Sequence, residues 1–229
     1  METKKILSSK FFILGEAPIE IKKLEWYCLY WWIIQAPFTL GLNKLLNTIS
    51  EKILYEVQNG TLETQKQWED IFKSHALAIV DEMGLGRDSH GLMHHNLFAE
   101  QVYATTSLTD DDLRKRVIKM KTNVALRDAI TQSFSSPLSG ICMMYVVEKI
   151  APQLFLTQKK IFLAAGAPIE KLRHSVLHEQ LEKNHAEEAE EYLQILKNLF
   201  AEKEINRITD EYASLWKSFL DEIFEKLKV

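Results

Sequence analysis

Three histidines and a carboxylate in one short segment have the types and the spacing of metal ligands. The segment RHSVLHEQLEKNHAEEAEEYL, residues 173–193, contains no Gly or Pro, so we expect a helix there. At 100° per residue, His178, Glu182 and His185 point from one helix face because they are spaced i, i+4, i+7. His174 lies on the same face. Since imidazole and carboxylate groups on one face can converge on an ion, the sequence predicts one wall of a metal site.

The spacing excludes the zinc-protease motif. In H-E-x-x-H the second histidine follows the first by four residues, and Glu182 occupies that place here. What remains, H-x3-E-x2-H, contains the Glu-x-x-His unit of dinuclear carboxylate proteins. A ferritin-like bundle needs a second such unit, which the chain lacks, so the remaining ligands come in another arrangement. The competing interpretation is a solvated helix face that carries histidines without a metal.

A glutamate inside an apolar segment is the next candidate ligand. Glu148 lies in ICMMYVVEKIAPQLF, with Tyr145 one turn before it. An ionised carboxylate in such surroundings is costly unless it is paired or binds a metal. The alternative is that Glu148 and Lys149 mark the solvated edge of a buried helix.

The segment IVDEMGLGRDSHGLMHHNLF supplies the other candidates. Glu82 ends an apolar stretch before a Gly-rich break, and His90, His94 and His95 follow. A phosphate-binding loop is a weak interpretation, because no strand precedes the glycines and no Gly-Lys-Ser/Thr follows them. The carboxylates of Glu82, Glu148 and Glu182, together with three of the histidines, would partly neutralise two divalent ions and leave an open site suited to oxygen.

Four short motifs within these segments resemble those of the haem-oxygenase-like diiron oxidases and oxygenases. That family shares an all-α, seven-helix bundle with TenA and PqqC-type proteins. Its pattern is a DE-x-G helix end, an MH-x-x-LF helix start, a Glu in an apolar helix, and H-x3-D/E-x2-HA. Here these are DEMGLG, MHHNLF, YVVE and HEQLEKNHAEEA, between residues ~80 and 190.

The resemblance implies a set of six ligands for two iron ions. They are Glu82, His94, Glu148, His178, Glu182 and His185. Glu182 stands where many relatives have Asp, which lengthens the side chain by one methylene. His90 is an alternative to His94, although MHHNLF matches the family better. His95 and His174 would then lie behind the ligands or be exposed.

The implied activity is oxidation of a substrate by O2, with two Fe ions as cofactor and an external reductant. Zinc or manganese can replace iron in a preparation. The resemblance is closest to the CADD-like branch, which implies p-aminobenzoate formation from a tyrosine of the protein itself. Tyr27, Tyr30 and Tyr145 are candidates for that tyrosine. Other branches act on small molecules such as fatty acids, amino acids or amines.

Two alternatives to an oxidase stay open. One is a metal-free TenA-like hydrolase, for which Cys142 is a candidate nucleophile. The other is a helical interaction protein that keeps the fold without the chemistry. The aromatic residues from Trp26 to Phe38 are expected to be core, and the alternative is that they line a substrate pocket.

The elements that position these residues are predicted from Gly, Pro and capping residues. Pro18 opens the first helix, which is kinked or broken at Pro37 and ends at Gly60 in a left-handed conformation. The other predicted helices span Thr61 to about Glu82, about Asp88 to Ala104, Ser107 to near Pro137, Pro137 to Gly166, Pro168 through the histidine segment, and Ala201 to Lys228. No segment alternates as a strand does. We expect one domain, residues 1–229, with about seven helices.

Composition narrows the partners and the location. The net charge of −4 and the absence of a Lys/Arg run give no reason to expect nucleic acid. The most apolar segment, WYCLYWWIIQAPF, is shorter than the ~20 residues of a membrane span, and no signal peptide is recognisable. Cys28 and Cys142 fit reduced core thiols. We therefore expect a cytoplasmic protein, and a homodimer is compatible with the sequence.

Overall fold

The computed structural model describes residues 2–83, 85, 93–116 and 124–228, and all regular structure in this part of the chain is helical. The all-α prediction is therefore confirmed. The α-helices are α1 (Glu2–Leu7), α2 (Ile21–Asn59), α3 (Leu62–Glu82), α4 (His94–Thr105), α6 (Val124–Ser133), α7 (Pro137–Ala164), α8 (Arg173–Leu199) and α9 (Glu202–Leu227). Shorter helical turns are η1 (Lys10–Ile13), η2 (Asp112–Arg116) and η3 (Ile169–Lys171).

Helix α2 continues without interruption through Pro37 for 39 residues. The sequence predicts a start at Pro18 and a kink or break at Pro37, but the helix begins at Ile21 and is not broken. Pro37 has no N–H to donate to the carbonyl one turn earlier, which weakens the helix locally. Ile34 before it and Leu42 after it are both buried, so tertiary packing holds the two halves in one helix.

The junction between α2 and α3 is closed by a capping box. The Thr61 hydroxyl accepts a hydrogen bond from the Thr64 N–H, and the Thr64 hydroxyl accepts one from the Thr61 N–H. The predicted start of α3 at Thr61 is confirmed. The left-handed conformation predicted for Gly60 is wrong, because its φ is −103° and its ψ is −160°. The next residue is already the extended N-cap of α3, and this leaves no room for a left-handed turn.

The C-terminal helices follow the sequence signals closely. Pro137 begins α7, as predicted. The helix ends at Ala164, two residues before the predicted end at Gly166, which has a φ of +85°. Helix α8 begins at Arg173 and not at Pro168, because the 3-10 turn η3 and the buried Leu172 intervene.

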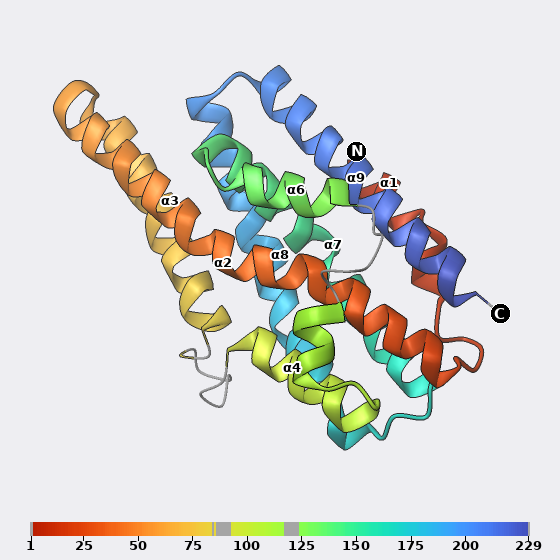
Figure 1. Cartoon of the computed structure of the whole chain (residues 1–229). Helices are drawn as coiled ribbons and strands as arrows, with labels where there is room; N and C mark the ends of the chain where they lie inside the picture. The colour runs from red at the N-terminus through yellow and green to blue at the C-terminus, as the bar shows by residue number, and fades with distance from the viewer. Residues whose placement is uncertain (1, 84, 86–92, 117–123, 229) are drawn as a thin grey trace.

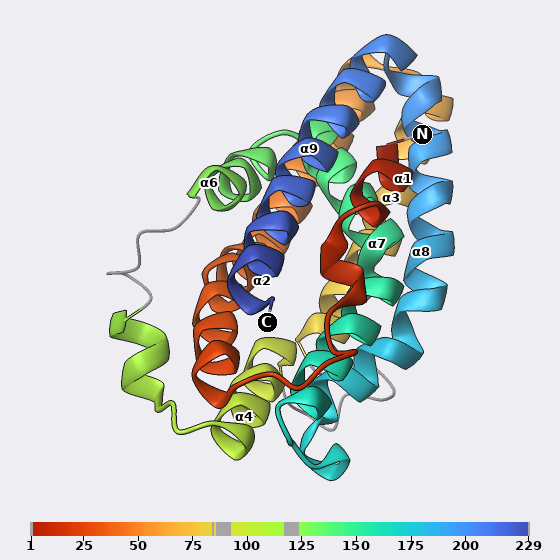
Figure 2. The same ribbon diagram turned by 90° about the vertical axis from the view of Figure 1, so that its right-hand side faces the viewer.

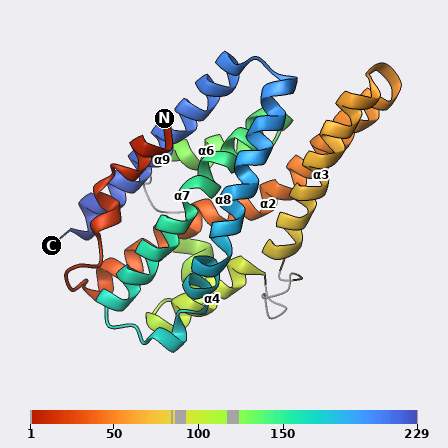
Figure 3. The same cartoon turned by 180° about the vertical axis from the view of Figure 1, so that it is seen from behind.

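Long helices form the body of the bundle, and several of them pack against each other in pairs (Figure 1). Helices α7 and α8 run side by side, and α4 packs against α8 (Figures 2 and 3). Helix α3 returns along the C-terminal half of α2, and α9 packs against α1 and α7. This arrangement brings the end of α3 and the start of α4 toward α8.

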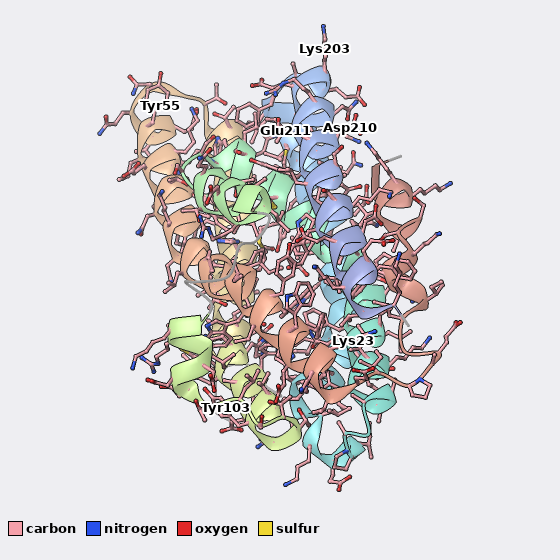
Figure 4. All side chains as sticks on the ribbon, turned by 45° about the vertical axis from the view of Figure 1, so that its right-hand side comes forward. Lys23, Tyr55, Tyr103, Lys203, Asp210 and Glu211 are labelled. Carbon is pink, nitrogen blue, oxygen red and sulfur yellow. The ribbon has the colours of Figure 1, made fainter. Side chains whose placement is uncertain are left out.

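Helix α9 is amphipathic and closes one side of the core. Its buried face includes Ile205, Tyr212 and Phe219. The charged side chains of Lys203 and Asp210 project away from the molecule (Figure 4). Burial of such an apolar stripe is the main force that holds a helix in a bundle.

The aromatic segment of α2 is core, as expected. Tyr27, Tyr30 and Trp31 are buried, and Tyr30 stacks on Phe219 of α9 with ring centroids 4.8 Å apart. Trp31 and Phe38 also border the cavity described below, which agrees with the alternative interpretation for these two residues. Within the described ranges, none of the helices combines the length and apolarity that crossing a membrane requires.

Candidate metal centre

Three predicted ligands from three helices meet in the interior. Glu82 is the last residue of α3, His94 is the first of α4, and His178 lies in the second turn of α8. Their ligand atoms all lie within 4.8 Å of one another, and His94 Nδ1 is 3.0 Å from Glu82 Oε1. Opposite ligands of one ion are about 4.2 Å apart when each bond is about 2.1 Å long. The spread is therefore close to that of a single metal site.

The connection between α3 and α4 places two of these side chains. Glu82 borders the interior cavity at the end of an amphipathic helix whose buried face includes Ile79. At the start of α4, His94 is buried completely, and Leu97 and Phe98 continue its buried face. His94 therefore begins a helix face that is packed into the interior.

Aromatic packing fixes the ring of His178. The ring is stacked on Phe155 of α7, with centroids 4.0 Å apart and planes at 15°. It meets His94 edge to face at 4.6 Å and His174 at 4.4 Å. Because apolar surroundings strengthen electrostatic interactions, a cation between these groups would be bound more tightly than at a surface.

A second group lies on α7 and α8. His185 Nδ1 is 3.7 Å from Glu148 Oε2, and His185 Nε2 is 3.8 Å from Asp81 Oδ2. These separations exceed hydrogen-bond length. Asp81 was not predicted, although it precedes Glu82 in the DE pair that the sequence analysis used.

One cavity of about 60 Å³ borders both groups. Its described lining contains one ligand candidate from each of three helices, Glu82, Glu148 and His178, and is otherwise mostly apolar. The remaining lining residues are Trp31, Ile34, Gln35, Phe38, Ile130, Val147, Ala151, Leu154, Phe155 and Trp216. A mostly apolar lining offers water few hydrogen-bond partners besides the carboxylates, the imidazole, the Gln35 amide and the two indoles.

Two of the predicted positions cannot be compared. His90, the alternative to His94, lies outside the described residues. Glu182 belongs to α8, but its side chain lies outside the described part. The other five candidates fall into the two groups above, Glu82, His94 and His178 in one and Glu148 and His185 in the other.

His95 and His174 lie in different surroundings. His95 is half-buried beside Trp32, with ring centroids 6.3 Å apart. Burial lowers the pKa of His95, while the carboxylate of Glu82 raises it and His94 lowers it. His174 is fully buried and not exposed, and it is hydrogen-bonded through both ring nitrogens.

The partners of His174 are residues that the sequence analysis missed. Gln35 lies 3.2 Å from His174 Nε2, and Gln158 lies 3.2 Å from His174 Nδ1. A signal was present for Gln35, which is an amide inside the apolar stretch WWIIQAPF, whereas Gln158 is flanked by Thr157 and Lys159 and gave none. Buried amides of this kind need hydrogen-bond partners.

The candidate tyrosines are buried away from the cavity. In the described lining of the cavity there is no tyrosine. Tyr27 is fully buried, its hydroxyl accepts a hydrogen bond from Gln158 Nε2 at 3.1 Å, and burial raises its pKa far above the usual range. Tyr30 is stacked between Trp26 and Phe219.

The candidate nucleophile Cys142 is poorly placed for catalysis. It is buried, and burial together with Glu204 raises the pKa of its thiol to about 12. A thiol at neutral pH is a poor nucleophile, because the thiolate is the reactive form. Cys142 is also absent from the described lining of the cavity.

Comparison with known proteins does not identify a family for this chain. The chain matches no protein-family model, and the search of curated proteins found none similar to it.

Proposed function

We propose that this chain is a non-haem diiron oxidase or oxygenase that uses O2. The observation that carries the proposal is the convergence of Glu82, His94 and His178 beside a cavity whose wall also carries Glu148. We further propose a haem-oxygenase-like, seven-helix arrangement. The described helices of ten residues or more support it; they are α2, α3, α4, α6, α7, α8 and α9.

The donor set fits two divalent first-row ions. Imidazole and carboxylate groups are ligands that iron accepts. Glu82, His94 and His178 would hold one ion, and Glu148 and His185 would hold the other. The resemblance adds Glu182 to the second ion. When bound, the two ions supply the electrons for O2 reduction and the oxidising power that acts on the substrate.

The protein's own residues would bind the ions, orient the ligands and exclude water. Phe155 holds the His178 ring, so that the ligand needs little reorganisation when an ion binds. Ile34, Leu154 and the other apolar lining residues keep bulk water from the reacting atoms. An external reductant is needed to return the ions to the ferrous state.

A small organic substrate is favoured over a tyrosine of the chain. No tyrosine is among the described residues that border the cavity. A cavity of about 60 Å³ has room for several water-sized molecules, since one water needs about 10–15 Å³. A substrate of more than a few atoms must therefore displace side chains on entry.

Metal loading tests the proposal. Anaerobic addition of Fe(II) should give two bound ions per chain, measured by elemental analysis after desalting. Glu148→Ala should bind one ion fewer. Glu187→Gln, at an exposed position on α8, is the matched control and should bind both. Less than one ion bound by the unmodified chain would rule out a diiron centre.

A further inference from the structure

A chain of hydrogen bonds crosses the core beside the proposed metal centre. Trp31 Nε1 donates to Gln35 Oε1 at 3.1 Å, and Gln35 Nε2 lies 3.2 Å from His174 Nε2. On the other side of the ring, His174 Nδ1 lies 3.2 Å from Gln158 Oε1, and Gln158 Nε2 donates to the Tyr27 hydroxyl at 3.1 Å. Three helices, α2, α7 and α8, contribute to this chain.

This chain of hydrogen bonds permits only one assignment of its protons. The indole of Trp31 can only donate, so the amide oxygen of Gln35 faces it and the amide nitrogen faces His174. His174 Nε2 must then accept, and the proton of the neutral ring is on Nδ1, which donates to Gln158 Oε1. A doubly protonated ring would place two donors face to face at Gln35.

His174 lies beside a candidate ligand, although it is not in the group of described residues whose ligand atoms lie within 4.8 Å of one another. Its ring centroid lies 4.4 Å from that of His178. Gln35 is part of the described lining of the cavity and His174 is not. The amide of Gln35 thus covers the lone pair of His174 Nε2 on the side where the cavity begins.

We propose that Gln35 is a positioning residue that keeps His174 from binding the metal. The hydrogen bond from its amide occupies the only lone pair that the neutral imidazole has for an ion. Loss of the amide frees that lone pair, and His174 then becomes an additional histidine ligand beside His178. This inference rests on the proposed function, because it requires a metal at the centre.

The hydrogen-bond chain can be tested without a metal. Long-range ¹H–¹⁵N NMR of the metal-free protein, labelled with ¹⁵N-histidine, reads the tautomer of each ring, and loss of one signal in His174→Phe assigns it. We expect the neutral Nδ1–H tautomer for His174. The Nε2–H tautomer would overturn the proposal, because Gln35 could not then be donating to Nε2.

Coordination is tested with Co(II) alone. In the Co(II)-loaded protein, each ligating imidazole with a ring N–H gives one hyperfine-shifted exchangeable proton signal. Gln35→Leu should add one such signal, and the double variant Gln35→Leu/His174→Phe should lose it again. The same number of signals in Gln35→Leu as in the unmodified protein would overturn the proposal and leave the diiron assignment standing.

Two further results keep the test decisive. If Gln35→Leu does not fold, Gln35→Met, which keeps the length of the side chain and has no N–H donor, takes its place in the Co(II) experiment and should add the same signal. An unchanged number of signals in Gln35→Met would contradict the proposal. If the unmodified protein binds no Co(II), the proposed function and this inference both fall.

Discussion

The imidazole of His178 lies flat on the ring of Phe155, with centroids 4.0 Å apart and planes at 15°. Phe155 belongs to α7 and His178 to α8, so packing between two helices sets the direction of a candidate ligand. A ligand that is already oriented loses less conformational freedom when it binds an ion. We therefore expect the strength of the proposed metal binding to depend on a side chain that has no ligand atom.

Phe155→Leu should weaken binding of the ion at His178. We expect a loss of about 10-fold, the lower end of the range for groups that orient metal ligands. The measurement is competition for Co(II) with a chelator of known affinity. Phe162→Leu truncates another aromatic residue of α7, one that packs on Tyr27, and should leave the affinity unchanged. Equal losses in the two variants would mean that the effect is general destabilisation.

His178→Ala and His185→Ala should each abolish tight binding of one ion. The bundle should still fold, because its stability comes mainly from apolar packing elsewhere. Iron content per chain measures the first effect, and far-UV circular dichroism measures the second. Two ions bound and full activity in either variant would mean that this face of α8 is not a metal site.

His94→Ala should lose iron, whereas His90→Ala should lose far less. His94 is fully buried and lies 3.0 Å from Glu82, within the group that also contains His178. His90 lies outside the described residues, beside Asp88 and Ser89 in the sequence. The two variants are compared by iron content and by substrate-dependent O2 uptake. The opposite ranking would keep the diiron centre and make His90 its ligand.

Stability should fall with decreasing pH because of His75. This histidine is buried, and its Nε2 lies 3.0 Å from the carbonyl of Leu42. Burial lowers its pKa in the folded state, and the hydrogen bond raises it by less. The unfolded chain therefore binds the proton more strongly. The full free energy of unfolding is therefore present above the unfolded pKa of about 6.5. It decreases as the pH falls below that value, because protonation of His75 then favours the unfolded chain.

Urea unfolding of the metal-free protein between pH 5 and 7.5 measures this effect. The slope that one histidine contributes is at most about 1.4 kcal/mol per pH unit. His174 contributes a slope of the same sign, so the comparison is between the unmodified protein and His75→Phe. The free energy of unfolding of His75→Phe should decrease less toward low pH than that of the unmodified protein. Identical slopes would mean that His75 does not titrate differently on unfolding.

Local sequence signals determined most of the helices. Thr61 and Thr64 form a capping box from neighbouring residues, and Pro137 begins α7 without help from the rest of the fold. The i, i+4, i+7 spacing likewise put the α8 candidates on one face. The predicted left-handed Gly60 is wrong because the cap of α3 follows it directly, and α2 is not broken at Pro37 because core packing on both sides outweighs the local preference.

Only the tertiary structure decided which candidates meet. His178 and His185 are seven residues apart, roughly 10 Å along a helix, and they join different partners from α3, α4 and α7. His174 shares their helix face, yet hydrogen bonds to Gln35 and Gln158 occupy both its nitrogens. The sequence separation between Gln35 and His174 is 139 residues. A contact over that distance depends on how helices pack, and helical periodicity carries no information about it.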